Sequence, residues 1–331
     1  MNKKIFTYLI VGITVCVVYT SCSKDDSDSG APGSPAGTMV GDEEEANALL
    51  EGIRLSSAGS YRYQYDDNGI FASMDYHNWS GKVETGKITW GYTNEDNSVS
   101  ENYTLNVSSN HIVSMSMNES GYYSDSWGES SWTRHGNASF SYNMKGQLSS
   151  ISISYSENGS EAGEGYSESG NGTTTFNYSS DHRLLSIKEV FNYIEDGERS
   201  TQTTNITCNY SSEPIKNPFY QYTPHMLNNV LEELEGFMYV GLLGKASSCI
   251  PSSYTVVWEE KYGDGESDSG SYTSSSNVSF NSNGTLRSAD GISYSYMSVG
   301  TRFILQDVEL KQDTINPDVK FHRHFRKIPM G

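Results

Sequence analysis

The sequence is poor in cysteine, in proline and in positive charge. Its 331 residues include 4 Cys, 8 Pro and 22 Lys or Arg, against 41 Asp or Glu. The formal net charge of −19 excludes nucleic acid as a partner, because phosphate binding needs a basic surface. Divalent cations, by contrast, are attracted without any dedicated site. Few prolines beside 24 tyrosines and 31 glycines favour strands joined by flexible turns.

The N-terminal segment has the arrangement of a secretory signal. Lys3 and Lys4 precede a mostly apolar run, Ile5 to Val18, and small residues lead into Cys22. The run is too short to span a bilayer, which takes about 20 apolar residues. Tyr19-Thr20-Ser21-Cys22 resembles a bacterial lipobox. We therefore predict a lipoprotein signal peptide at residues 1–21 and acylation of Cys22. The alternatives are an ordinary cleaved peptide, with Cys22 incidental, and a retained transmembrane anchor.

The residues after Cys22 predict both the location and a tether. Ser23 to Asp28 resembles the lysine-plus-acidic tag that sends lipoproteins of the Bacteroidota to the outer cell surface. We expect a protein anchored by lipid to the outer membrane and exposed at the surface. Residues 22–48 are rich in acid, Gly, Pro and Ser and read as a tether, since they cannot bury enough apolar area to fold. Residues 49–331 read as one domain.

The remaining cysteines predict one disulfide. Cys16 leaves with the signal, so Cys208 and Cys249 stay as a pair in an oxidising compartment. The alternative is two separately buried thiols, because sequence alone gives no geometry for the pair.

A hairpin motif recurs along the chain. It combines an apolar residue, three or four turn-formers, an apolar pair and a serine, with a Gly or a substitute in the turn. The copies are Tyr65–Met74, Tyr142–Ile151, Tyr178–Ile187 and Phe280–Ala289, with a weaker one at Val107–Met115. Gly69, Gly146 and Gly284, and His182 in their place, supply the left-handed residue of a tight turn. The flanks alternate with period 2, as half-buried antiparallel strands do.

Polar segments between the copies read as long acidic loops at the far end of the sheet. They run over 118–131, 157–172, 195–201 and 263–276. Because they have few apolar residues to bury, we expect them to tolerate shortening. One stretch breaks the strand pattern. Thr223 and Pro224 start an apolar repeat at helical spacing, which predicts an amphipathic helix near 224–236, ended or kinked at Gly236.

These hairpins, with Asn217-Pro218-Phe219 and the run Leu242 to Ser247 before Pro251, resemble an uncharacterised Bacteroidota lipoprotein domain of unknown function with a porin-like fold. The hairpins alone also resemble cell-surface YD repeats. The resemblance covers about residues 60–331. It implies a mainly β chain: a curved antiparallel meander, porin-like or open-barrel-like. It implies no activity.

Porin-like need not mean membrane-spanning. A transmembrane strand needs about 9–11 residues with a continuous lipid-facing band. Here apolar alternation meets charges such as Lys82, Glu84 and Lys87 after five or six residues. We expect a soluble tethered domain, with an integral outer-membrane barrel as the alternative.

Candidate site residues are few. Asp264, Glu266 and Asp268 alternate as calcium ligands do, although Ser275 stands where an EF-hand has Glu; a solvated acidic segment is the other reading. His322 and His324 have metal-ligand spacing without a third ligand nearby. Asp313-Thr314-Ile315 resembles a Bacteroidota O-glycosylation acceptor, which makes Thr314 a candidate site. Calcium is the one cofactor considered.

Two tryptophans point to a ligand. Trp127 and Trp132 stand in or beside an acidic segment, where an aromatic ring could stack on sugar; cross-strand core pairing is the alternative. No catalytic residue is nominated, since no nucleophile elbow is present. We expect a binding or scaffold protein of the cell surface, more a binder than an enzyme, with glycan or another surface macromolecule as partner. The alternatives are a hydrolase whose site is built from distant residues, and a purely structural lipoprotein.

Overall fold

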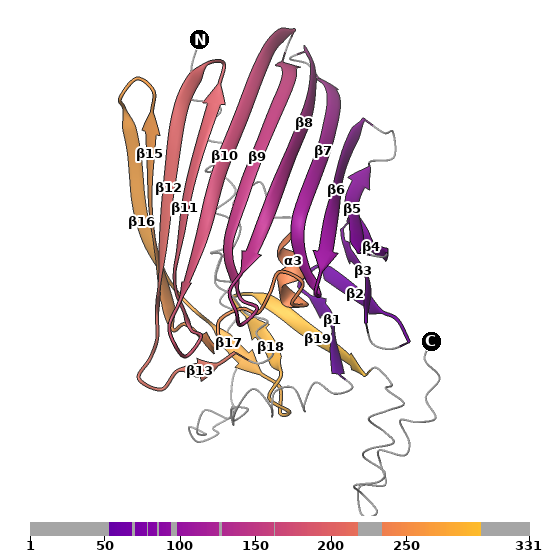
Figure 1. Cartoon of the computed structure of the whole chain (residues 1–331), viewed down its shortest axis with the longest axis vertical. Helices are drawn as coiled ribbons and strands as arrows, with labels where there is room; N and C mark the ends of the chain where they lie inside the picture. Colours follow the sequence, from indigo (N-terminus) through magenta and orange to yellow (C-terminus); the bar gives the residue numbers. More distant parts are fainter. Residues whose placement is uncertain are drawn as a thin grey trace, which may run out of the picture. The chain divides into compact units, whose positions relative to one another are not determined.

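The computed structural model describes residues 53–298, apart from 68–69, 78, 85, 94–97, 126–127, 162 and 218–233. All of them belong to one compact unit, Gly37–Gly331. As expected, this part of the chain is mainly antiparallel sheet (Figure 1). No helix of the described part is long and apolar enough to cross a lipid bilayer.

The strands lengthen toward the middle of the chain and shorten again after it. They are β1 (Ile53–Ala58), β2 (Tyr61–Tyr65), β3 (Phe71–Tyr76), β4 (Trp79–Glu84), β5 (Lys87–Thr93), β6 (Val99–Ser108), β7 (His111–Asp125), β8 (Gly128–Tyr142), β9 (Leu148–Glu161), β10 (Glu164–Tyr178), β11 (Leu184–Glu195), β12 (Glu198–Asn209), β13 (Ile215–Lys216), β14 (Cys249–Ile250), β15 (Ser253–Tyr262), β16 (Ser267–Ser275), β17 (Val278–Phe280), β18 (Leu286–Ala289) and β19 (Ile292–Ser298), with helix α3 (Glu235–Tyr239) between β13 and β14.

The sheet is a meander in which consecutive strands pair antiparallel from β1 to β12. The chain then leaves the sheet and returns as β15, which pairs with β12, while β13 and β14 form a small ladder of their own. The last strand, β19, pairs with the first, β1. Two residues separate β16, which pairs with β15, from β17, which pairs with β18. Among the described residues, the one ladder of β16 is that with β15, so the sheet is not closed into a barrel.

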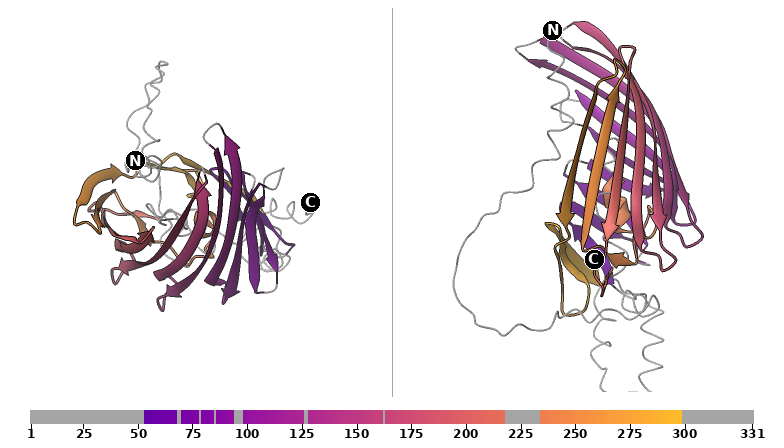
Figure 2. Two further views of the ribbon diagram at one scale, coloured as in Figure 1. Left: turned by 90° about the horizontal axis from the view of Figure 1, so that it is seen from above. Right: turned by 90° about the vertical axis from the view of Figure 1, so that its left-hand side faces the viewer.

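The two faces of the sheet differ sharply in composition. We call the face that carries the buried side chains and contacts α3 the core face, and the opposite one the outer face. In β9 the core face holds Ile151, Ile153 and Tyr155, while serines alternate with them on the outer face. The period-2 prediction is confirmed for this strand. Figure 2 shows that the long strands form a strongly curved sheet.

The hairpin turns follow the repeat. Gly146 and Gly284 have φ of +74° and +81°, and His182, at the equivalent position, has φ of +67°. The left-handed conformation predicted for these residues is confirmed; Gly69 lies outside the described residues. In the first of these turns the side-chain oxygen of Asn143 accepts hydrogen bonds from the backbone N–H groups of Lys145 and Gln147. These two bonds close the turn locally.

The predicted long acidic loops are wrong. The segments 118–131, 157–172 and 263–276 are mostly strand, as the ends of β7 to β10, β15 and β16. Their polar residues still alternate, but with Gly, Glu and Tyr on the core face in place of aliphatic residues. Shortening 160–169 would remove paired residues of β9 and β10, so we expect it to destabilise the sheet.

Most of the helix predicted near 224–236 lies outside the described residues. In the described helix, α3, Gly236 is the second residue, so this glycine does not end it. A Cβ on Gly236 would lie 2.5 Å from Cδ1 of Tyr61 and 2.6 Å from Sδ of Met74. Gly236 is needed for close approach to the sheet. The neighbouring Phe237 is fully buried and meets Trp90 edge to face.

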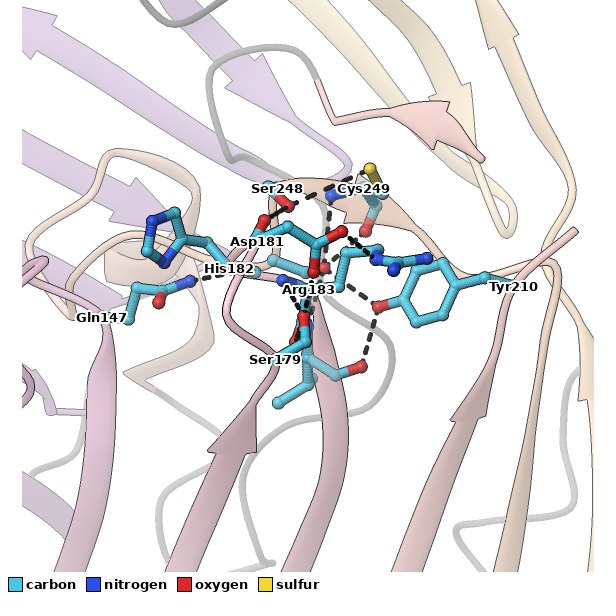
Figure 3. Close-up of polar contacts among 10 residues, drawn as sticks. Gln147, Ser179, Asp181, His182, Arg183, Tyr210, Ser248 and Cys249 are labelled. Atoms are coloured by element: carbon cyan, nitrogen blue, oxygen red, sulfur yellow. Dashed lines mark hydrogen bonds and ion pairs between the residues drawn. The ribbon is translucent and has the colours of Figure 1, made fainter. Parts of the chain in front are cut away.

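A polar clasp joins the base of the long strands to the segment after α3 (Figure 3). Its centre is the buried hydroxyl of Ser247, which accepts a 3.0 Å hydrogen bond from the backbone N–H of Leu184 and donates a 2.6 Å one to the carbonyl of Cys249. Tyr210 lies 3.0 Å from the same hydroxyl and donates to the carbonyl of Leu184. Gln147 donates from Nε2 to the carbonyls of His182 and Ala246. These bonds fix two hairpin turns to one segment.

Cys208 and Cys249 are both buried, and both are free thiols. The predicted disulfide is therefore not formed in this structure, which has the separate-thiol arrangement instead. An even number of cysteines does not place two of them within bonding geometry. Burial raises the pKa of Cys208 to about 12, so its thiol stays protonated and unreactive in the native protein.

We expect both thiols to resist alkylation in the native protein at pH 8 and to react fully after denaturation without reductant. Mass spectrometry of the alkylated chain measures this. A chain that takes up label only after reduction would show that the two cysteines pair in solution.

Replacement of Gly136 by Val should destabilise the domain. A Cβ at this position would lie 2.2 Å from Cε of Met117 and 2.8 Å from the backbone oxygen of Ser154, which cannot move away. We expect a loss of about 1–3 kcal/mol in the free energy of unfolding, measured by urea denaturation. Gly165→Val is the matched control, because its nearest neighbour is 3.8 Å away. Equal losses in the two variants would contradict this account of the core face.

Candidate functional site

A row of glutamates crosses the core face in the half of the long strands that lies away from α3. Register places Glu101 opposite Glu119, Glu119 opposite Arg134, and Arg134 opposite Glu157. The row continues on β10, β11 and β12 through Glu168, Glu195 and Glu198. Directly paired residues share a face, so all seven side chains point to the same side of the sheet. We call this the glutamate row.

Aromatic side chains flank the glutamate row on both sides. Toward the strand ends, Trp132 pairs with Gly121 and Gly159, and Tyr166 pairs with Gly159. Toward the base, Tyr155 pairs with Gly136 and Gly170. The glycines leave room for the neighbouring rings: a Cβ on Gly121 would lie 2.3 Å from Nε1 of Trp132, and one on Gly159 would lie 2.6 Å from the Tyr166 ring. The rings therefore lie flat along the sheet.

Arg134 stands at the centre of the hydrogen-bond network in the row. Its guanidinium lies 2.7 Å from a carboxylate oxygen of Glu157 and 3.2 Å from one of Glu119. The hydroxyl of Tyr103 donates to Glu119 at 2.6 Å, and that of Tyr166 donates to Glu157 at 2.6 Å.

Tyr155 connects this network to the next strands. Its hydroxyl hydrogen-bonds Glu168, and the Arg134 guanidinium lies 5.3 Å from the centre of its ring, at cation–π distance. Glu119 and Glu157 are both buried. They share the Arg134 guanidinium as their cation, and each accepts a hydrogen bond from a tyrosine hydroxyl.

The row carries more negative charge than its one cation balances. Burial lowers the pKa of Arg134, but Glu157 and Glu119 more than offset this and raise it overall. Burial, and then the charge of Glu119, raise the pKa of Glu101. The pKa of Glu195 rises through burial and then through Glu168. These shifts mark a surface where further negative charge is costly and a cation or a hydrogen-bond donor is favoured.

Other strands extend the acidic surface. Glu260 on β15 shares the core face, because it pairs with Gln202, which pairs with the buried Phe191. Asp268 pairs with Glu260 and accepts a hydrogen bond from Tyr262 at 3.2 Å. Burial raises the pKa of Glu260 as well.

The sequence-predicted site residues have different outcomes. Trp132 lies on the core face beside the glutamate row; Trp127 lies outside the described residues. Asp264 accepts a hydrogen bond from the backbone N–H of Glu266 in the exposed turn before β16. Asp268 accepts a hydrogen bond from the hydroxyl of Tyr262. Within the described ranges, no three His, Cys, Asp or Glu side chains are arranged to hold a metal ion. Calcium binding by these three residues stays a prediction. Cys22, Thr314, His322 and His324 lie outside the described residues.

The glutamate row was missed by sequence reasoning, although each of its parts was visible. The sequence pattern predicts a loop for the segment that holds Glu157 and Glu168, and another loop for the segment that holds Glu119 and ends just before Arg134. The available signal was the spacing Tyr155-x-Glu157 and Tyr166-x-Glu168, which keeps an aromatic and an acid on one face of a strand. Whether these residues line up across neighbouring strands depends on the register of each strand pair, which the sequence does not give.

The clasp of Figure 3 has the residue types of a hydrolase but the contacts of a structural element. Its serine, Ser247, bonds backbone groups and Tyr210, and His182 takes part through its backbone carbonyl. Arg183 forms an ion pair with Asp181 at 2.7 Å in the same turn. The arrangement holds backbone segments together, and it presents no serine–histidine pair for nucleophilic attack.

Known structures give a limited likeness. The chain is similar to a porin-like protein from Bacteroides vulgatus, with 14% identity, 71% of this chain and 92% of that chain covered, and a TM-score of 0.43. A porin-like protein from Bacteroides uniformis is 14% identical, with 64% and 97% covered and a TM-score of 0.24. No family model and no curated protein matches the chain.

Removal of the central cation should destabilise the domain in a pH-dependent way. In Arg134→Gln, Glu119 and Glu157 lose the cation that they share, and we expect a loss of about 1–3 kcal/mol at pH 7, below the range for fully buried pairs because Arg134 is partly exposed. The loss should shrink as the pH falls, since burial and the charge of Glu119 raise the pKa of Glu101, and protonation of Glu101 removes negative charge from the row.

Urea denaturation of the variant and the parent across pH measures this effect. Lys188→Gln, on the outer face of β11, is the matched control and should be neutral. A loss that is the same at pH 4 and pH 7 would contradict the ion-pair explanation.

Proposed function

We propose that this protein is a lipid-anchored, surface-exposed binding protein of the outer membrane, and that the glutamate row with its flanking aromatic rings binds glycan. The observation that carries the proposal is the alternation of ring and carboxylate on one sheet face. Trp132 and Tyr166 lie on one side of the row and Tyr155 on the other. Sugar rings stack their C–H faces on aromatic rings, and their hydroxyls donate to carboxylates.

The outer face supports a tethered domain rather than an integral barrel. On β7, β8 and β9 it is built of paired polar residues, such as Ser116 with Asn137 and Ser139 with Ser152. A membrane barrel has the opposite pattern, with an apolar band facing outward. Anchoring through Cys22 accounts for membrane attachment without any lipid contact of the sheet.

Binding is favoured over hydrolysis by the state of the central carboxylates. A glycosidase needs one carboxyl free to donate a proton and a second one placed to attack or to activate water. Here Glu119 and Glu157 are both engaged by Arg134 and by tyrosine hydroxyls, so neither has the freedom that either role requires.

A glycan array probed with the protein tests this function. Trp132→Ala should weaken binding by about 5- to 150-fold, since stacking of one ring is worth about 1–3 kcal/mol by analogy with bases on aromatic platforms. Tyr122→Ala is the control, because Tyr122 is exposed on the outer face of the neighbouring strand β7. Absence of binding to every glycan on the array, or an equal effect of both variants, would overturn the proposal.

A further inference from the structure

The part of the core face that carries the glutamate row has no packing partner among the described elements. The helix α3 covers the base, where Phe237 contacts Trp90 and Phe71. The β13–β14 ladder also lies at the base, through Ile250 in the core and the clasp around Ser247. Above them the face presents Glu101, Glu168 and Glu195 together with the aromatic rings.

The described chain ends at Ser298, and 33 residues follow it, 299–331. The last 13 of these, 319–331, have a composition unlike that of the rest of the chain. They include Lys320, Arg323, Arg326 and Lys327 with no Asp or Glu, in a protein of net charge −19. Aromatic and aliphatic residues alternate with these charges, as in Val319, Phe321 and Phe325. We call residues 319–331 the basic segment.

We propose that the basic segment docks on the glutamate row of its own chain. The chemistry of the two is complementary: Lys and Arg side chains meet a row of six glutamates that contains one arginine, and Phe321 and Phe325 meet the rings of Trp132 and Tyr166. Guanidinium groups also form bidentate bonds with carboxylates and stack on aromatic rings.

The connection is long enough for this contact. From Ser298 to Lys320 there are 320 − 298 = 22 residues, which span about 70 Å when extended. The row lies 157 − 148 = 9 residues along β9 from its base, or about 30 Å. Strand β19, from which the segment leaves, lies at the base beside β1 (Figure 1). Tethering gives the segment a local concentration of the order of millimolar, so individually weak ion pairs suffice to hold it.

The docked segment would occupy the face proposed above to bind glycan, so a glycan would have to displace it. In this respect the inference rests on the proposed function, but the contact itself does not.

Zero-length carbodiimide cross-linking of the full chain, mapped by mass spectrometry, tests the contact. The reagent joins a lysine amine to a carboxylate that it touches. We expect Lys320 and Lys327 to join Glu101, Glu168, Glu195 or Glu260, and the links to disappear in 1 M salt, where screening falls to about 3 Å. Links to outer-face acids such as Glu84 and Glu259, or no links at all, would overturn the proposal.

Two further measurements separate the possible outcomes. A mixture of isotopically light and heavy protein distinguishes cross-links within one chain from cross-links between two copies. If most cross-links join a light chain to a heavy one, the basic segment docks on a second molecule, and docking within its own chain is overturned. Truncation after Asp318 should increase hydrogen exchange at the ends of β9 and β10, whereas Lys188→Gln with Lys261→Gln on the outer face should not.

The same truncated chain relates the contact to function. It should bind array glycans several-fold more tightly than the full chain. Cross-links to the row without glycan binding would retain the docking and reject the function. Glycan binding without cross-links would support the proposed function and reject the docking.

Discussion

The in-register pairing of β6 through β12 is the constraint on which the rest of this structure depends. Each ladder brings a residue directly opposite its partner, so every second position along seven strands faces the same side. A slip of one residue would turn the glutamates to solvent and bring serines onto the core face. The large apolar set at the base, including Met115, Ile153 and Phe191, holds the register, because such a slip would expose it as well.

The glutamate row is possible because the apolar base determines the fold independently of it. Burying Glu119 and Glu157 costs free energy unless their charge is compensated, and a single cation, Arg134, serves both. The clasp around Ser247 anchors the hairpin turns at the opposite ends of these strands. The apolar base therefore stabilises the fold. The half of each strand farther from α3 can then hold charged and aromatic side chains on its core face.

Glycines on the core face make room for the aromatic rings beside them. Gly121, Gly136, Gly159 and Gly170 lie in core-face rows where each neighbours a large side chain on the adjacent strand. A small residue opposite a ring lets the ring lie along the sheet, and this alternation lets a strongly curved sheet fill its concave side. The result is a layer of rings on both sides of the carboxylates, which sequence composition alone presents as unrelated Gly, Tyr and Glu.

Local patterns in the sequence were sufficient for the strands, for the meander and for the turns at Gly146, His182 and Gly284, because these depend on period-2 alternation and on backbone conformation within ten residues. They were insufficient for the strand ends, where alternation continues with polar residues and resembles a loop. They were also insufficient for the state of Cys208 and Cys249, which depends on distance in space. The glutamate row was decided by tertiary structure alone, since its residues come from seven strands and meet only when register aligns them.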